Sequence, residues 1–141
     1  MHSQHRSYRE RDLISLQKLM SELGYHVELD ELKNNVKGIH EKGGEIIVRE
    51  LDGEVVASVC VLIDARLAEG IYAEIVSLIV SEKVRGKGIG AGLLKEAEKW
   101  AAQRVSKIRV RANVVREAAH RFYTDQGYML TKSQKIFIKN V

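Results

Sequence analysis

The sequence predicts an α/β fold in which one mixed, mostly antiparallel sheet is flanked by four helices. Three observations lead to this prediction. Apolar residues repeat at helical spacing in several segments, an Asp-Gly pair joins two β-branched runs, and a strand is followed by a glycine-rich loop, a helix and another strand, the order of a parallel crossover. The 141 residues fit a single domain over 1–141 with one core.

Helix and strand signals alternate along the chain with few gaps. In chain order the predicted elements are helices over 13–23 and 29–39, strands over 45–50, 54–63 and 72–80, a helix over 89–101, a strand over 108–112, a helix over 114–124, and strands over 128–131 and 134–138. Asp12 is a suitable N-cap for the first helix, and Gly24 stops it. The second helix ends near Gly43 and Gly44.

Turn residues and apolar spacing define the later elements. The Asp52-Gly53 pair predicts a hairpin between the first two strands. The apolar end of the strand over 72–80 suggests burial on both faces. The fourth helix is expected to bury Ala118, Ala119 and Phe122 and to end at Gly127.

Composition excludes several classes of protein. Hydrophobic residues make up 45% and charged residues 30% of the chain, a globular balance, and the longest apolar run is too short to span a membrane. We see no secretory signal and expect a cytoplasmic protein without a membrane partner. The net charge of +4 is evenly spread and aromatic residues are only 6%, which argues against a nucleic-acid partner. The single Cys60 excludes an internal disulfide, and the histidine spacing makes a metal site improbable.

The most informative segment is a glycine loop between the strand over 72–80 and the next helix. It contains Val84, Arg85, Gly86, Lys87, Gly88, Ile89, Gly90, Ala91 and Gly92. Glycines leave backbone N–H groups uncovered, and the helix that follows supplies further unpaired donors and the positive end of its dipole. Two cations, Arg85 and Lys87, flank these donors. The loop is thus suited to a diphosphate, although a flexible turn would have a similar composition.

Two other phosphate-binding motifs fit less well. A P-loop needs Gly-Lys followed by Ser or Thr, and the sequence has no such run. Gly86, Gly88 and Ala91 match the dinucleotide fingerprint only loosely, because they begin five residues beyond the strand and no acidic residue follows at the expected distance.

These residues resemble the GNAT superfamily of acetyl-CoA-dependent N-acetyltransferases. The segment over 73–80 and the loop after it look like the family's central strand and pyrophosphate loop, with its R/Q-x-x-G-x-G/A element at 85–90. A second element is similar to the family's fourth helix; it comprises Asn113, Ala118, Ala119, Phe122, Tyr123, Gly127 and Tyr128. Ser81 and Glu82 stand where many members have a proline, which adds stiffness to the turn but makes no phosphate bond.

The resemblance implies how acetyl-CoA would be held. In the family the central strand bulges and splays from its neighbour, and the pantetheine arm pairs with the exposed backbone, here Leu78, Ile79 and Val80. The N–H near Leu78 would stabilise negative charge on the thioester oxygen. The same three residues are also compatible with an ordinary core strand.

The resemblance also suggests the proton transfers. Glu74 is the first candidate for the base that takes the amine proton. Otherwise it faces solvent or pairs with a lysine on a neighbouring strand, and water carries the proton. Tyr123 resembles the family tyrosine that protonates the CoA thiolate, and its alternative role is packing beside Phe122. Asn113 would bond pantetheine, cap the fourth helix, or do both. Ala119 belongs to the same cofactor-binding helix.

Two further features have simpler interpretations. Cys60 would carry an acetyl group in a ping-pong route, but it lies in an apolar strand with no histidine nearby, so inert burial is favoured. Glu28, Asp30 and Glu31 would attract a cationic amine near the acceptor pocket or form a solvated helix face.

We therefore expect an N-acetyltransferase that moves acetyl from acetyl-CoA directly to a primary amine in a ternary complex. The acceptor, an amine-bearing small molecule or a protein amine, is left open because pocket loops vary. The alternatives are a catalytically silent acyl-CoA sensor or protein-interaction module, and a small basic RNA-binding domain. The family often forms dimers, so a homodimer is a further expectation.

Overall fold

The computed structural model describes residues 3–112 and 117–141, which divide into two compact units, residues 1–110 and 111–141. The first unit contains a five-stranded sheet in the order β1-β2-β3-β4-β5. Its elements are β1 (Ser3–Ser7), α1 (Leu13–Glu22), α2 (Leu29–Glu41), β2 (Glu45–Leu51), β3 (Glu54–Arg66), β4 (Gly70–Val80), α3 (Ile89–Ala102) and β5 (Ile108–Val110). The second unit contains α4 (Glu117–Asp125).

The sheet is mixed and mostly antiparallel, as predicted. β1, β2, β3 and β4 pair antiparallel in sequence order, and only β4 and β5 are parallel. The helix α3 connects these two parallel strands, so the predicted crossover is confirmed. At the β2–β3 hairpin, Asp52 and Gly53 both have positive φ, 50° and 82°, which is the backbone form that an Asp-Gly turn favours.

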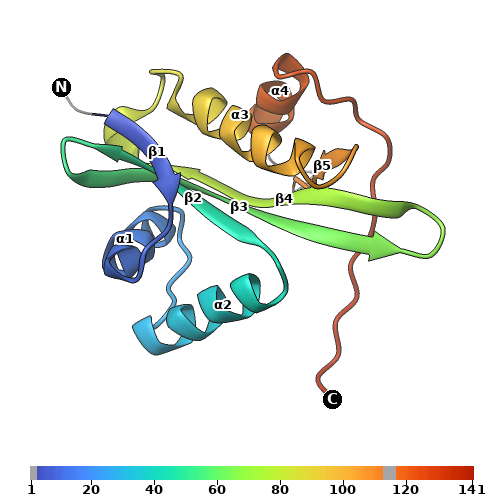
Figure 1. Cartoon of the computed structure of the whole chain (residues 1–141), viewed down its shortest axis with the longest axis horizontal. Coiled ribbons are helices and arrows are strands. Elements are labelled where there is room, and N and C mark those ends of the chain that lie inside the picture. Colours follow the sequence, from blue (N-terminus) through green and yellow to red (C-terminus); the bar gives the residue numbers. More distant parts are fainter. Residues whose placement is uncertain (1–2, 113–116) are drawn as a thin grey trace. The chain divides into compact units, whose positions relative to one another are not determined.

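Helices cover both faces of this sheet (Figure 1). On one face, α1 and α2 place Leu16, Leu19, Leu32 and Val36 against apolar residues of β2, β3 and β4. On the other face, α3 buries Leu93, Leu94 and Ala97 almost completely. The two helices of the first face are the amphipathic segments that the sequence predicted over 13–23 and 29–39.

Asp12 precedes α1 as predicted, but its side chain does not cap that helix. Its carboxylate instead accepts from the Arg9 N–H at 2.8 Å and from Arg6 of β1 at 2.8 and 2.9 Å. Gly24 follows the helix with φ 89°, the left-handed form that commonly ends helices.

Several sequence predictions were wrong. β1 was missed, because a polar edge strand shows no apolar alternation. The strand predicted over 108–112 ends at Val110. The strands predicted over 128–131 and 134–138 are absent, since residues 128–141 have no regular secondary structure in the structure. A β-like composition forms a strand only when a partner strand takes up its backbone hydrogen bonds.

Burial also differs from the prediction at two places. Ile79 is 6% exposed, but Leu78 and Val80 are half-buried, so the end of β4 is not buried on both faces. In α4, Ala118 is exposed, whereas Ala119 and Phe122 are half-buried. The predicted start of this helix at 114–116 lies outside the described residues.

Candidate functional site

The glycine loop leads from β4 into α3 and leaves its backbone open. Gly86 and Gly88 have φ values of 78° and 77°, a left-handed form that favours glycine, and no other heavy atom lies within 4 Å of where a Cβ would sit. Gly88 is the N-cap of α3, so no side chain caps the first-turn N–H groups. That turn also contains no acidic residue to compete with an anion.

The loop is anchored where it leaves β4. The Ser81 hydroxyl donates to Glu22 Oε1 at 3.2 Å, and the Glu82 N–H donates to the other oxygen of Glu22 at 3.1 Å. Arg85 Nε donates to the Val80 carbonyl at 3.1 Å, which holds Arg85 along the end of β4. Val84 is buried, whereas Arg85, Gly86, Lys87 and Gly88 are all exposed. The exposed part is therefore short and is held in place from its start.

A bulge interrupts β4 just before the loop. Cys60 of β3 pairs with Ser77, but its neighbour Val61 pairs with Ile75, which leaves Val76 as an extra residue. The pairing of β4 with β5 ends at the same point, with Ile75 opposite Val110. Among the described strands, residues 77–80 therefore pair only with β3. The bulge and the early separation from β5 that the resemblance implied are both present.

Hydrogen bonds around the bulge indicate which way the Leu78 N–H points. The Ser81 N–H donates to Val56 of β3 at 2.8 Å. Because hydrogen-bonded and non-hydrogen-bonded pairs alternate in an antiparallel ladder, the pairs Val80–Ala57 and Leu78–Val59 are non-hydrogen-bonded. The N–H groups of Leu78 and Val80 thus point away from β3, toward the side where β5 pairing has ended.

Glu74 lies on β4 before the bulge and is held by Arg109 of β5. It is only 9% exposed, and its Oε1 accepts from Arg109 Nε at 2.6 Å. The same guanidinium donates to Glu69 at 2.7 Å and to Asp64. Burial lowers the pKa of Arg109, but the bonds to Glu74 and Glu69 and the carboxylate charges raise it further, so the net shift is upward. Glu74 thus pairs with a cation on a neighbouring strand, but the partner is an arginine, Arg109, and not the lysine that the sequence analysis considered.

Tyr123 belongs to α4 in the second unit. Its ring makes edge contacts with Phe122 and Tyr128, at centroid distances of 5.1 and 5.8 Å. Burial raises the pKa of Tyr123 above its ordinary value, so the phenol keeps its proton at neutral pH. Ala119 is half-buried on the same helix. Asn113 lies outside the described residues.

Cys60 is buried on β3, and burial raises its pKa to about 12. A neutral, inaccessible thiol is a poor nucleophile, in keeping with the interpretation of inert burial. Glu28, Asp30 and Glu31, at the start of α2, are exposed. Within residues 3–112 and 117–141, no group of three or more histidine, cysteine or acidic residues is arranged to hold a metal ion.

Three structural groups were missed by the sequence reasoning. Arg6 bonds Asp12 and also Glu50 at 3.0 Å, Glu22 anchors the loop, and Arg109 holds Glu74. Arg6 and Glu50 are 44 positions apart, and Glu22 and Ser81 are 59 positions apart, so no local sequence pattern predicts either contact. Of the three, only Arg109 could have been suspected from the sequence, because a charged residue in a half-buried strand needs a partner of opposite charge.

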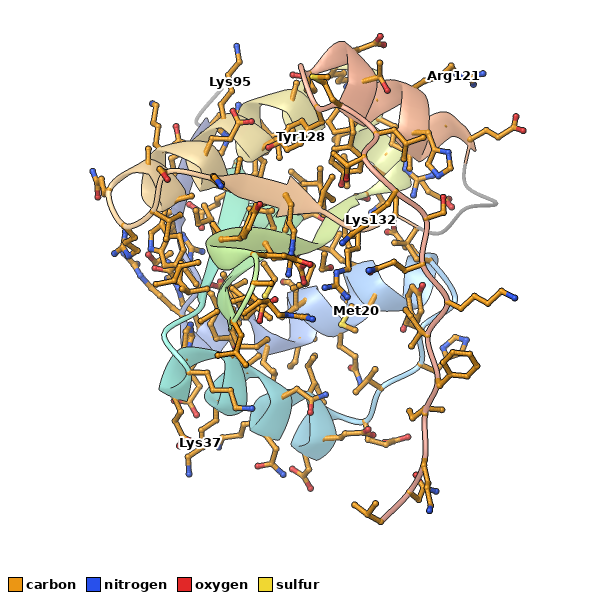
Figure 2. All side chains as sticks on the ribbon, turned by 90° about the vertical axis from the view of Figure 1, so that its right-hand side faces the viewer. Met20, Lys37, Lys95, Arg121, Tyr128 and Lys132 are labelled. Carbon is orange, nitrogen blue, oxygen red and sulfur yellow. The ribbon has the colours of Figure 1, made fainter. Side chains whose placement is uncertain are left out.

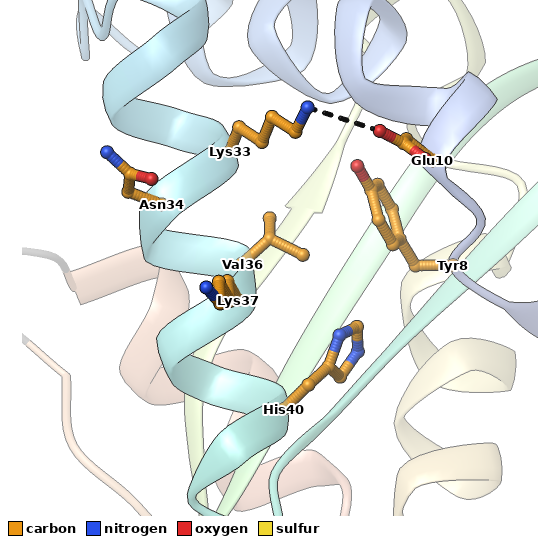
Figure 3. Close-up of a pocket in the computed structure, with 7 residues that line it drawn as sticks. All are labelled: Tyr8, Glu10, Lys33, Asn34, Val36, Lys37 and His40. Carbon is orange, nitrogen blue, oxygen red and sulfur yellow. Dashed lines mark ion pairs between the residues drawn. The ribbon is translucent and has the colours of Figure 1, made fainter.

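A separate pocket of about 450 Å³ lies between α2 and the segment that joins β1 to α1 (Figure 3). Its lining residues are Tyr8, Glu10, Lys33, Asn34, Val36, Lys37 and His40. None of them belongs to the glycine loop, β4 or α3. Each of its lysines and its histidine has a carboxylate partner, such as Glu10 for Lys33 at 3.3 Å. The candidate site is therefore the glycine loop with the bulged strand, not this pocket.

A bulged strand that leads through a glycine loop into an uncapped helix N-terminus is an arrangement suited to a phosphorylated cofactor. Residues 8–128 match the acetyltransferase (GNAT) family, and the chain belongs to that family. The family resemblance is thus confirmed, and acetyl-CoA is the cofactor that goes with it. The uncapped loop fits a diphosphate, because it offers N–H donors, two nearby cations and no carboxylate in the first turn of α3.

Solved structures share the fold. A transcriptional regulator from Bacillus halodurans C-125 is 24% identical, with a TM-score of 0.85 over 97% of this chain and 100% of its own. An acetyltransferase from Trypanosoma brucei is 21% identical, with a TM-score of 0.83 over 98% and 100%. The aminoglycoside N-acetyltransferase AAC(6′)-Iy, in complex with CoA, is 13% identical, with a TM-score of 0.88 over 99% and 96%.

Identities this low establish the fold alone. No curated protein matches the sequence. Among the described residues, no helix is both long and apolar enough to cross a membrane.

Proposed function

We propose that this protein transfers an acetyl group from acetyl-CoA to a primary amine by direct attack in a ternary complex. The observation that carries the proposal is the combination of an uncapped glycine loop at the start of α3 with a bulge that frees one edge of β4. The first feature suits a diphosphate and the second suits an extended arm, and CoA has both.

The proposed cofactor-binding residues divide into three groups. Backbone N–H groups of Gly86, Gly88 and the first turn of α3 would hold the diphosphate, with Arg85 and Lys87 beside them. The first turn includes Ile89, Gly90 and Ala91. On β4, the outward N–H and C=O groups of residues 78–80 would pair with the pantetheine arm as an added strand. Ala119, Tyr123 and Asn113 would complete the cofactor site.

Acetyl-CoA supplies an acetyl group activated as a thioester. The Leu78 N–H, which points away from β3, would donate to the oxygen of that acetyl group and stabilise the negative charge that develops there. Tyr123, whose pKa burial raises further above neutral pH, would donate its phenolic proton to the departing sulfur.

We propose that Glu74 takes the proton of the amine, directly or through water. Two observations support it: Glu74 lies four residues before Leu78 on the same strand, and the bond from Arg109 fixes its carboxylate. A positioned carboxylate has its geometry set before the reaction, so no further ordering of its side chain is needed when the amine arrives.

The first experiment measures release of free CoA thiol with a panel of amines that includes polyamines, aminoglycosides, amino acids and lysine peptides. An acetyltransferase releases thiol with at least one class of acceptor. Binding of acetyl-CoA without thiol release from any acceptor would favour the silent sensor, and absence of both would refute the proposal.

The second experiment tests Glu74 with a matched control. The pH profile of Glu74→Gln should move toward high pH, where more of the amine is already deprotonated. Glu69→Gln removes another carboxylate bonded to Arg109 and should leave the profile in place. If Glu74→Gln leaves the profile in place as well, another group takes the proton.

A further inference from the structure

Glu22 is the last residue of α1, a position where the helix itself does not favour an acidic side chain. The carboxyl end of a helix carries the negative end of the helix dipole, so a cation is preferred there and a carboxylate is disfavoured. The Glu22 carboxylate accepts two hydrogen bonds from the segment that leads from β4 into the glycine loop, from the Ser81 hydroxyl at 3.2 Å and from the Glu82 N–H at 3.1 Å. The contacts of Glu22 thus serve the loop and not α1.

Packing fixes both of the elements that Glu22 connects. α1 packs through Leu19 and Met20 against the apolar core that it shares with β2, β3 and β4, and Met20 is labelled in Figure 2. Ser81 is only 5% exposed, and its N–H donates to the Val56 carbonyl of β3 at 2.8 Å. Glu22 therefore joins the start of the loop to a helix that is held against the sheet.

The two hydrogen bonds of Glu22 fix the turn with which the loop begins. Glu82 is the first residue of a single 3₁₀ turn over residues 82–84, and Ser81 precedes it as the N-cap. The Ser81 hydroxyl accepts from the Lys83 N–H at 3.4 Å. The Glu82 N–H has no acceptor within the turn, because the first N–H groups of a helix lack an internal partner. Glu22 supplies that acceptor and so acts as a second cap of the same turn.

Beyond this turn the loop is open. Residues 85–88 are exposed, and no other heavy atom lies within 4 Å of where a Cβ of Gly86 or Gly88 would sit. Glycine loses more backbone freedom than any other residue when it is held in one conformation. An anion that binds this backbone has to order it, so a loop that is already fixed at its start binds the anion more tightly than a free one.

We propose that Glu22 is a positioning residue for CoA, which acts through Ser81 and Glu82 by holding the glycine loop in the orientation that binds the diphosphate. The inference rests on the proposed function, because the position of the loop matters only if the loop binds CoA. Glu22 would be the link between α1 and the cofactor site.

Charge alone leads to the opposite expectation, which makes the proposal easy to test. A carboxylate near a diphosphate repels it, so removal of the Glu22 charge would by itself strengthen CoA binding. Glu22 is exposed, and solvent and salt screen this repulsion. Under our proposal the loss of the fixed turn outweighs the screened repulsion, and removal of Glu22 weakens binding.

The test combines isothermal titration of acetyl-CoA with hydrogen exchange of the free full-length protein. Glu22→Ala should weaken acetyl-CoA binding by about threefold to tenfold, the effect of a lost helix cap, and should speed amide exchange over residues 82–88. Glu22→Gln keeps one acceptor oxygen and should have a smaller effect. Glu41→Ala is the matched control and should change neither quantity, because Glu41 is the exposed last residue of α2 and pairs with Lys37 of its own helix.

A proline at position 82 tests the mechanism, because it stiffens the same turn without Glu22. Ser81 has φ −57° and ψ 140°, the extended form that a residue before proline adopts. Proline is also favoured at the first position of a helical turn, where its missing N–H is not needed by the turn itself. Glu82→Pro added to Glu22→Ala should therefore restore most of the lost affinity.

Circular dichroism verifies that each variant keeps its fold. Binding that is unchanged or tighter in Glu22→Ala would overturn the proposal, as would an equal loss in Glu41→Ala or a loss that the proline does not recover. Failure of the proposed function gives a different result. A wild-type protein that binds no acetyl-CoA refutes both proposals, whereas equal binding by the wild type and Glu22→Ala refutes only the role of Glu22.

Discussion

Replacement of Gly88 by aspartate tests the proposed diphosphate cradle, by which we mean the backbone N–H groups of residues 86–91, at the start of α3. Gly88 is the N-cap of α3, with φ 77° and open space where a Cβ would sit, so a side chain there meets strain but no clash. The left-handed backbone costs roughly 1–2 kcal/mol of stability for an ordinary residue, and less for Asp or Asn. The protein should therefore stay folded while a carboxylate stands before the first-turn N–H groups.

The magnitude follows from the added charge. Two unit charges about 4 Å apart repel by about 1 kcal/mol in water and about 4 kcal/mol at an effective dielectric constant near 20. Gly88 lies on an exposed loop, so the true value falls between these limits. Since 1.36 kcal/mol is a factor of ten, Gly88→Asp should weaken CoA binding between about fivefold and about a thousandfold relative to Gly88→Asn.

Isothermal titration of acetyl-CoA at low and high salt is the assay. Gly88→Asn has the shape of the aspartate variant without its charge, and the difference between the two should shrink as salt rises. Gly53→Asp is a second control, because Gly53 has φ 82° and equally open space at the β2–β3 turn. Equal affinities for the aspartate and asparagine variants at position 88 would refute the cradle.

Three further predictions concern Tyr123, Cys60 and Asp12. Burial raises the pKa of Tyr123 further above neutral pH, so the phenol carries the proton that an acid must donate. Tyr123→Phe should lower kcat by about 10²–10⁴-fold with little change in CoA affinity, and unchanged turnover would exclude Tyr123 as the acid. Burial raises the pKa of Cys60 to about 12, so a thiol reagent at pH 8 should modify it only as the chain unfolds, and rapid labelling of native protein would contradict this. Burial raises the pKa of Asp12, but the hydrogen bonds from Arg6 and the Arg9 backbone outweigh it and leave the pKa below its ordinary value. Asp12→Ala should therefore cost about 3 kcal/mol near pH 7 in urea unfolding, and the difference from wild type should shrink as pH falls through the lowered pKa; a constant difference would exclude this ion pair as its source.

Local patterns predicted those parts of the fold that local physics controls. The leucine spacing of α1 and α2 is set by a helix that covers one sheet face, and the Asp52-Gly53 turn is set by backbone geometry. The strand β1 escaped prediction because it is a polar edge, where no apolar face is required. Residues 128–131 and 134–138 were predicted as strands from composition, but strand formation needs a partner strand, which composition does not identify.

In the candidate site, too, the sequence predicts local features but not long-range contacts. The glycine spacing predicts the diphosphate cradle, because only backbone without side chains lets consecutive N–H groups approach an anion. The sequence did not identify Arg109 as the partner of Glu74, because Arg109 lies 35 residues away on a parallel strand. Strand register brings these two residues side by side.

The bulge at Val76 is the feature on which the chemistry of β4 depends, and no residue type marks it. Before the bulge, the Ala73 N–H donates to Lys107 O at 2.9 Å, so its direction is toward β5. Regular alternation would continue this direction at residues 75, 77 and 79 and would turn the Leu78 N–H toward β3. The extra residue shifts the alternation by one, as the bonds of Ser81 to Val56 and of Arg85 to Val80 confirm. A single inserted position thus places Ile79 on the sheet face that α1 and α2 cover, and it also turns the Leu78 N–H toward the side left open by β5.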